Sequence, residues 1–362
     1  MEDRDRPAAL TMPPASRSAK APAAPPATES GPGHPGGWIV SPAFDLLLVA
    51  NLGWPLLLLP GLSGRNETAV DFWQVYFVTL PHRWITLVLV ALDPDRRERR
   101  GVRLVAIAAA MMALVAGVWL GTAAFTCLAV VDYVWNAWHF AAQHAGVLRI
   151  YGRKVGGGPA WMERYGIRFF VTYAVLRTAG WTTGWLETSD SSRDVLRAVD
   201  LLALAVPTTL AVAALCGVTR ARAGKTVYTL SVCALYGGLL LSLSNRASAW
   251  VVPLATASGL FHATEYLAVV THYARRRRNV GAGGPSDGSR ACGSVPGHLR
   301  GGAGVDGGLA GGGPAFEFWL GLNLWAAAVH YAFDGMIWKL RRPETARALG
   351  GVPVIAGRGP SR

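Results

Sequence analysis

A long apolar segment that begins near Ala249 ends in the stretch 262-HATEYLAVVTHY-273, and four arginines follow at 275–278. On a helix that turns by about 100° per residue, His262, Glu265 and His272 fall on roughly one face. Ionisable side chains inside a membrane helix are costly, so they usually face a partner, an ion or the interior of a bundle. We therefore expect other segments of the chain to supply partners for this face.

The composition indicates an integral membrane protein. Of the 362 residues, 51% are hydrophobic and 16% are charged, and the mean hydropathy is +0.28. Apolar runs of about 20 residues, the length that crosses a bilayer as a helix, recur along the chain. The net charge of +13 comes from short Arg and Lys clusters beside these runs, which is typical of loops that orient membrane helices. No nucleic-acid motif accompanies them, so the expected partner is the lipid bilayer and not nucleic acid.

The apolar runs predict an all-α, polytopic bundle of eight or nine transmembrane helices. A disordered Pro/Ala-rich tail at 1–37 is expected to precede it, and this tail shows no removable signal peptide. The bundle itself should cover 38–273, with a glycine-rich flexible loop at 274–315, a last helix at 316–341 and a flexible tail at 342–362. The expected spans are approximately 38–60, 72–92, 102–120, 122–147, 167–185, 199–218, 227–243, 249–273 and 316–340.

Basic clusters set the expected orientation. With the N-terminus in the cytoplasm, most Arg and Lys fall in inside loops, at 93–103, 148–166, 219–226 and 274–315. Strict alternation of helix direction would nevertheless leave the basic residues at 339–342 outside. Either the last helix is re-entrant, or the number of spans before it is one too many or too few.

Polar residues also share a face in two other spans. The fourth span carries Asp132, Asn136, His139 and Gln143 at offsets of four, three and four, and the last carries Asn323, His330 and Asp334 at offsets of seven and four. Arg177 in the fifth span has three open interpretations: it neutralises an intramembrane acid, meets an anionic head group, or snorkels to the interface.

Imidazole and carboxylate groups without thiolates suit iron, zinc, copper or manganese. The expected cofactor is therefore a divalent transition metal, and iron is favoured because two histidines and a carboxylate with open positions suit oxygen-activating iron. The candidate catalytic carboxylates, as ligands or as groups that orient a ligating ring, are Glu265, Asp334 and Asp132. The candidate metal ligands are His82, His139, His262, His330, His272 and His144.

In general pattern, these scattered histidines are similar to those of histidine-rich membrane oxygenases. Such families include membrane desaturases and hydroxylases, and bacterial carotene-cleaving dioxygenases. The HxxxH and HxxHH boxes of the desaturases are absent, since His139 and His144 are spaced as HxxxxH. His82 is followed by Arg83 and Trp84 rather than by small residues. No residue role is therefore transferred from either family.

The sequence favours a membrane metalloenzyme, either an oxygenase, a desaturase or a hydroxylase, that acts on a lipid-soluble small molecule. Three alternatives stay open: a haem protein for electron transfer, a metal-free transporter or proton relay, and a non-catalytic scaffold in which the polar faces serve helix association. The enzyme hypothesis depends on one condition. His82, His139, His262 and His330, which lie far apart in the sequence, must meet in the folded chain.

Overall fold

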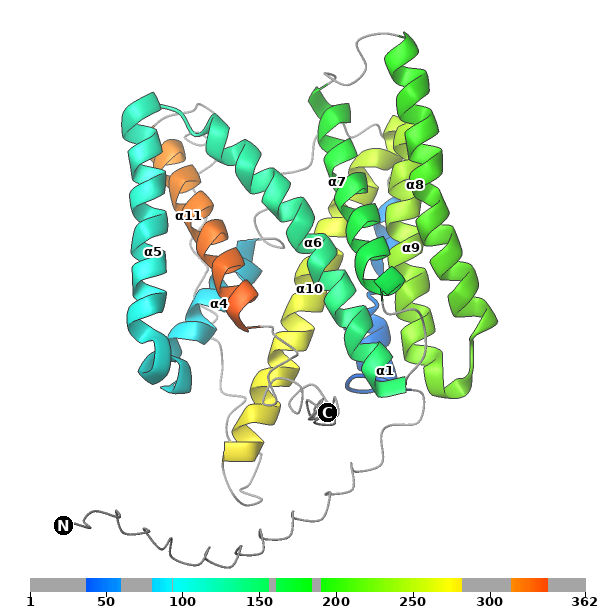
Figure 1. The fold of residues 1–362 in the computed structure, drawn as a ribbon, viewed down its shortest axis with the longest axis horizontal. Coiled ribbons are helices and arrows are strands. Elements are labelled where there is room, and N and C mark those ends of the chain that lie inside the picture. The colour runs from blue at the N-terminus through cyan, green and yellow to red at the C-terminus, as the bar shows by residue number, and fades with distance from the viewer. Residues whose placement is uncertain are drawn as a thin grey trace, which may run out of the picture. The chain divides into compact units, whose positions relative to one another are not determined.

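The computed structural model describes residues 37–59, 80–92, 94–155, 161–183, 190–281 and 314–337, and its regular elements are all helices (Figure 1). The all-α prediction is therefore confirmed for the described part of the chain. The predicted tails and most of the glycine-rich segment lie outside the described residues. The long helices are α4 (Leu80–Leu92), α5 (Pro94–Thr122), α6 (Thr126–Val155), α7 (Ile167–Thr183), α8 (Asp190–Cys216), α9 (Ala223–Ser244), α10 (Ser248–Gly281) and α11 (Pro314–Ile337).

Three stretches of the described chain are long and apolar enough to cross a membrane, which is compatible with the predicted location. They are Gly101–Thr122 in α5, Ser191–Cys216 in α8 and Arg220–Ser244, which includes α9. Large apolar side chains on α5 and α8, such as Leu120 and Leu202, are exposed, as expected for surfaces that face lipid. Helices α6, α10 and α11 are also long, and they carry most of the buried histidines, acids and amides.

The first predicted span is not one continuous helix. Within it the chain forms α1 (Pro42–Phe44), a π-helical turn η1 (Asp45–Val49) and a 3-10 turn η2 (Trp54–Leu58). The break falls at Asn51, which has a φ of 45° and whose amide donates to Thr264 Oγ1 on α10 at 3.0 Å. Asp45 accepts hydrogen bonds from the backbone N–H groups of Ile39 and Val40. The polar residues that interrupt this apolar segment therefore stabilise its irregular backbone.

Two other boundaries differ from the prediction. The hairpin between α5 and α6 turns at Ala123, which has a φ of 51°, two residues after the expected boundary between the spans at 102–120 and 122–147. Helix α10 continues past Tyr273 to Gly281, into the segment that was predicted to be a flexible loop. The run of arginines from 275 to 278 is thus part of a helix.

Helices α6, α10 and α11 run in the same direction (Figure 1). In each pair of helices, the residue numbers rise together on both helices from one contact to the next, which shows that the two helices are parallel. They are Phe140–His262 and His144–Glu265 for α6 with α10, and Phe125–Gly321 and His139–His330 for the α6 region with α11. The strict alternation of direction on which the predicted orientation rested therefore fails between α10 and α11. As a result, α11 runs opposite to the direction expected for the last span and ends on the same side of the bundle as α6 and α10.

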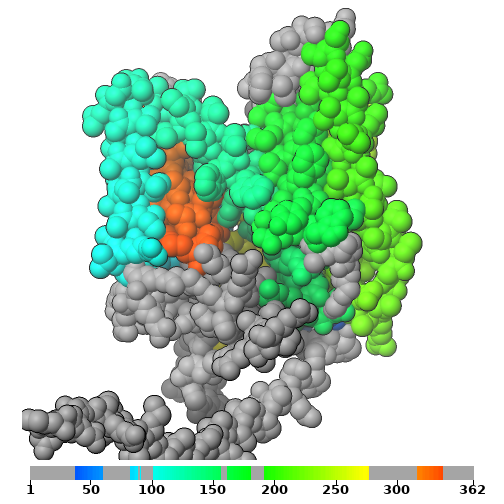
Figure 2. All heavy atoms as spheres, viewed as in Figure 1, coloured from blue at the N-terminus to red at the C-terminus, as the bar shows by residue number. Residues whose placement is uncertain are grey.

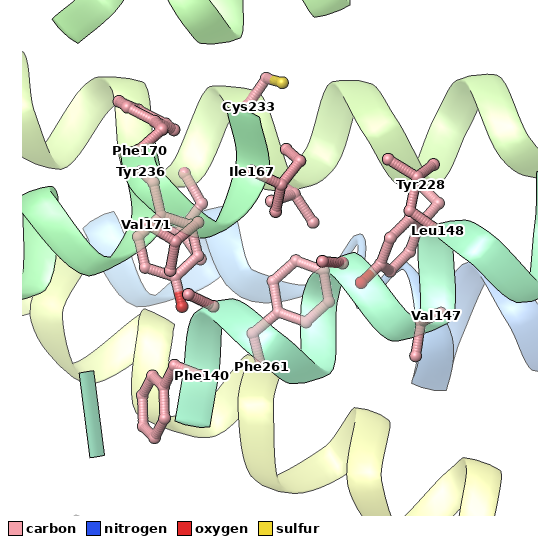
Figure 3. Packing of buried hydrophobic residues seen from close by; sticks show 14 of the residues in the cluster. Phe140, Val147, Leu148, Ile167, Phe170, Val171, Tyr228, Cys233, Tyr236 and Phe261 are labelled. Carbon is pink, nitrogen blue, oxygen red and sulfur yellow. The ribbon is translucent and has the colours of Figure 1, made fainter. Parts of the chain in front are cut away.

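The apolar core has two main parts, and helices α4, α6, α10 and α11, which carry His82, His139, His262 and His330, lie where they meet. The larger part joins α6, α7, α9 and α10, with Leu148, Phe170 and Tyr236 fully or almost fully buried (Figure 3). The smaller part joins α4 and α11, through Val90 and Phe333, to partly buried side chains of α5. Histidines from α6 and α10 thus face histidines from α4 and α11.

Gly224 allows the N-terminal segment to pack closely on α9. A Cβ atom at this position would lie 2.9 Å from Trp38 Cε3 and 3.0 Å from Tyr151 Cε1. Because both rings are buried, we expect Gly224→Ala to lower the free energy of unfolding by about 1–3 kcal/mol. Thermal unfolding in detergent measures the change. Gly237→Ala on the same helix, where an added Cβ has no neighbour within 4 Å, is the control, and an equal loss in both variants would contradict the packing argument.

Candidate metal centre

Four buried imidazoles face one another, and each comes from a different helix. His82 (α4), His139 (α6), His262 (α10) and His330 (α11) have exposed fractions of 1, 9, 0 and 0%. They form a closed circuit in which neighbouring ring centroids are 4.8–5.0 Å apart and the planes meet at 75–84°. Imidazoles that share one metal at ~2.0–2.1 Å would have neighbouring centroids roughly 4.5–5.2 Å apart. The observed spacing is therefore that of rings around a common centre.

Asp334 adds a carboxylate to two of these rings. The Nε2 atoms of His139 and His330 are 3.1 Å apart, and Asp334 Oδ2 lies 3.7 Å from each of them. The point equidistant from these three atoms in their plane is about 2.0 Å from each, the usual length of a metal–nitrogen or metal–oxygen bond. This triangle could hold a metal ion with little rearrangement.

The ring of His262 lies in the same region, and its two nitrogens are available to bind a ligand. Its ring is fully buried, and neither of its nitrogens has a hydrogen-bond partner among the described residues. Leaving such a group unpaired is costly, so buried imidazoles are normally satisfied. Phe140 stacks on the ring at a centroid distance of 3.9 Å and holds its plane. Ligand atoms of His82, His139 and His262 also lie within 4.8 Å of one another, so they form a second group that could hold a metal.

A chain of hydroxyl groups orients His330 and Asp334. Tyr266 donates to Asp334 Oδ1 at 2.9 Å, and its oxygen is hydrogen-bonded to the Thr86 hydroxyl. Thr86 has one hydroxyl proton, which it donates to the backbone carbonyl of His82 at 3.2 Å, so Thr86 Oγ1 accepts from His330 Nδ1, 2.8 Å away. The network thereby assigns the proton of His330 to Nδ1. Its Nε2 lone pair then faces His139, as metal binding requires.

Thr86 and Tyr266 were not among the predicted site residues. A lone Thr on an apolar helix and a Tyr beside Glu265 are both common in packed cores, so spacing alone did not distinguish them. Their role becomes visible only when α4, α10 and α11 are brought together.

Asp132 lies next to the cluster rather than in it. Its Oδ2 is 3.7 Å from Arg83 Nη2, and its Oδ1 accepts from the Tyr331 hydroxyl at 3.0 Å. The Tyr331 ring in turn lies 5.0 Å from the ring of His139. The polar face predicted for the fourth span is present on α6, but the side chain of Tyr331 lies between Asp132 and His139.

Glu265 and His144 form a separate buried pair. His144 Nδ1 is 2.7 Å from Glu265 Oε2, Tyr228 donates to Glu265 Oε1 at 2.9 Å, and the Tyr236 hydroxyl is 3.0 Å from His144 Nε2. Glu265 therefore contacts α6 and α9 and not the four histidines. Residues three apart on a helix point about 60° away from each other, and here that angle directs His262 and Glu265 to different neighbours.

His272 belongs to neither group of metal-ligating atoms in the described structure. It lies ten residues after His262, which is about 15 Å along the helix axis, and the charges of Arg276 and Lys154 act on it. The structure thus places four of the six predicted histidine ligands together with Asp334, and it places His144 and His272 elsewhere.

No known protein family matches this chain, and neither a curated protein nor a solved structure is detectably similar to it. The functional argument therefore depends on the donor atoms, their spacing and their burial.

The His144–Glu265 pair gives a prediction about stability. Glu265→Ala would leave His144 buried beside an empty space, and we expect it to lower the free energy of unfolding by about 3 kcal/mol. Glu265→Gln, which keeps the side-chain volume and an acceptor for Tyr228, should cost clearly less. Chemical unfolding followed by tryptophan fluorescence compares the two, and an Ala variant as stable as the parent would show that the pair does not stabilise the fold.

Proposed function

We propose that this chain is a membrane metalloprotein. His139, His330 and Asp334 bind a divalent transition metal, and His82 and His262 complete its surroundings. The triangle of two Nε2 atoms and one carboxylate oxygen, with its centre about 2.0 Å from each corner, carries this proposal. The lone pair on His330 Nε2 and the unpaired ring of His262 support it.

The donor set favours iron. Two histidines and a carboxylate that leave positions open are typical of non-haem iron sites that activate oxygen, while thiolates are absent from both groups. Such a metal would supply redox chemistry with oxygen. The protein residues would hold and orient it: Thr86 and Tyr266 fix the ring and the carboxylate, and the buried position of the cluster excludes bulk water.

A lipid-soluble molecule fits the surroundings of this site. On α6, Val131, Val134 and Trp135 are exposed, and Trp135 stacks on Tyr331, the neighbour of His139. Figure 2 shows α11 at the base of a recess between α5 and α6. These exposed apolar side chains would let an apolar substrate approach His139 from the lipid side along α6, past the partly exposed ion pair of Arg83 and Asp132 beside Tyr331. We propose oxidation of such a substrate as the reaction.

The alternative functions fit this geometry less well. A haem would need a flat space between two axial histidines, and the other two rings and Asp334 crowd that region. If the cluster were purely structural, the ring nitrogens of His262 would be expected to have hydrogen-bond partners. A metal-free proton relay is the alternative that uses the same residues. Because such a relay contains no metal, the metal content of the purified protein distinguishes the two functions.

Metal analysis of the purified protein tests the proposal. We expect about one metal ion per chain. His330→Ala and Asp334→Ala should each lower metal affinity by tenfold or more, because each removes a ligand. His272→Ala, which changes a partly buried histidine outside both groups, is the control and should keep the parent's metal content. A parent protein that retains no iron, manganese, copper or zinc after gentle purification and reloading would contradict the proposal.

A second variant tests the hydroxyl chain. Tyr266→Phe removes the donor to Asp334 Oδ1 but leaves all proposed ligands in place, so metal affinity should fall by about 10–100-fold. Competition with a chelator of known affinity measures this. Tyr236→Phe removes a similar hydroxyl from the separate His144 network and should leave metal affinity unchanged. Equal effects in both variants would show that the loss is a general effect on stability.

A further inference from the structure

A partly exposed polar cluster lies beside the candidate metal centre and joins three helices. It consists of Arg83 on α4, Asp132 and Asn136 on α6, and Tyr331 on α11. The Tyr331 hydroxyl donates to Asp132 Oδ1 at 3.0 Å, and its oxygen is 3.1 Å from Asn136 Oδ1 and 3.4 Å from Arg83 Nη2. We call these four residues the Arg83–Asp132 cluster.

The two charges of this cluster meet only loosely. Arg83 Nη2 is 3.7 Å from Asp132 Oδ2, whereas a charge-assisted hydrogen bond is ~2.7–2.9 Å long. Arg83 Nε is buried and has no hydrogen-bond partner among the described residues. The two side chains keep exposed fractions of 14% and 22%. Donor and acceptor capacity is therefore left where a molecule from outside the bundle can reach it.

The surface around this pair is apolar. Val131, Val134 and Trp135 on α6 are exposed, and Trp135 stacks on Tyr331 at a centroid distance of 6.3 Å. Helices α6 and α11 border the recess visible in Figure 2. A loosely paired charge beside such a surface is costly, and a contact that served only to link helices would be more favourable if the pair were close. The arrangement fits a ligand that brings a polar group on an apolar body.

The chemistry of the pair selects a hydroxyl group. A guanidinium only donates hydrogen bonds and a carboxylate only accepts them, while a hydroxyl group does both. A hydroxyl oxygen about 2.8 Å from Arg83 Nη2 and from Asp132 Oδ2 fits between these atoms. It would accept from the arginine and donate to the aspartate. A ligand carboxylate would meet the like charge of Asp132, and an ether or a hydrocarbon would offer Asp132 no proton.

The cluster is close enough to the histidines to position a substrate there. The Tyr331 ring lies 5.0 Å from the ring of His139 and 5.6 Å from that of His330. Asp132 precedes His139 by seven residues, which is about 10 Å along the axis of α6. A molecule held by its hydroxyl group at the cluster can therefore place its apolar part beside His139.

We propose that the Arg83–Asp132 cluster binds the hydroxyl group of a lipid-soluble alcohol, and that such an alcohol is the substrate class of the candidate metal centre. Arg83 and Asp132 hold the hydroxyl group, while Tyr331 and Asn136 keep Asp132 in place. This inference rests on the proposed function, because it names the substrate class for the same site.

Binding of three matched probes tests the inference without requiring turnover. The full-length protein in lipid nanodiscs is titrated with dodecanol, dodecyl methyl ether and dodecane at equal mole fractions, and the midpoint of thermal unfolding reports binding. We expect the parent to bind dodecanol at least tenfold more tightly than the ether, because only the alcohol donates a hydrogen bond to the charged Asp132. Equal shifts with alcohol and ether, or no shift with either, would overturn the inference.

Variants of the pair locate the site. Asp132→Asn keeps an acceptor for Tyr331 but removes the charge, so the preference for dodecanol should fall to about threefold or less. Arg83→Gln/Asp132→Asn removes both charges together and replaces the single variant if that protein does not fold. Arg103→Gln/Asp194→Asn, which removes one exposed arginine and one exposed aspartate outside the cluster, is the matched control and should keep the parent's preference. The same preference in the cluster variants and in the control would exclude this site.

Metal content, measured on the same samples, separates this inference from the proposed function. The cluster variants should keep the parent's metal content, because every proposed ligand is still present. A parent that prefers dodecanol but retains no metal would contradict the metal centre and, with it, the assignment of the alcohol as its substrate. A parent that binds metal but shows no preference for dodecanol would contradict the alcohol site alone.

Discussion

The structure depends on keeping imidazoles and a carboxylate in an apolar interior. Such groups are expensive to bury unless each one is paired with a hydrogen bond, an opposite charge or an ion. His139, His330 and Asp334 meet through Nε2 and Oδ2 atoms, and the outer atoms of His330 and Asp334 are satisfied by Thr86 and Tyr266. Only a set of helices that converge at one point can meet this requirement, and α4, α6, α10 and α11 do so.

The second polar network supports this convergence from a neighbouring face of α10. Glu265 binds α6 through His144 and α9 through Tyr228, so it fixes the position of α10 between them. His262 lies less than one turn away on α10 and is aimed at α4 and α6. One helix thus uses two adjacent polar residues for different purposes, the first in the candidate metal centre and the second in holding the bundle together.

Much of this arrangement could be predicted from sequence, and the exceptions have physical causes. The helices followed from apolar runs, and His82, His139, His262 and His330 were expected to meet because an intramembrane imidazole needs a partner. Glu265 was grouped with them because it shares a broad helical face with His262, but helical spacing cannot show which neighbour each residue meets. Arg177 had three open interpretations, and the structure pairs it with Asp200, a residue that the sequence did not single out. The direction of α11 was also beyond prediction, because it is set by packing against α5 and α6 and not by the order of the spans.

X-ray absorption spectroscopy of the metal-loaded protein tests the central claim most directly. The account predicts a first shell of nitrogen and oxygen atoms at ~2.0–2.2 Å, with the outer scattering that imidazole rings produce and with no sulfur shell. A spectrum without imidazole scattering, or with sulfur at ~2.3 Å, would contradict the assignment of the metal to these histidines.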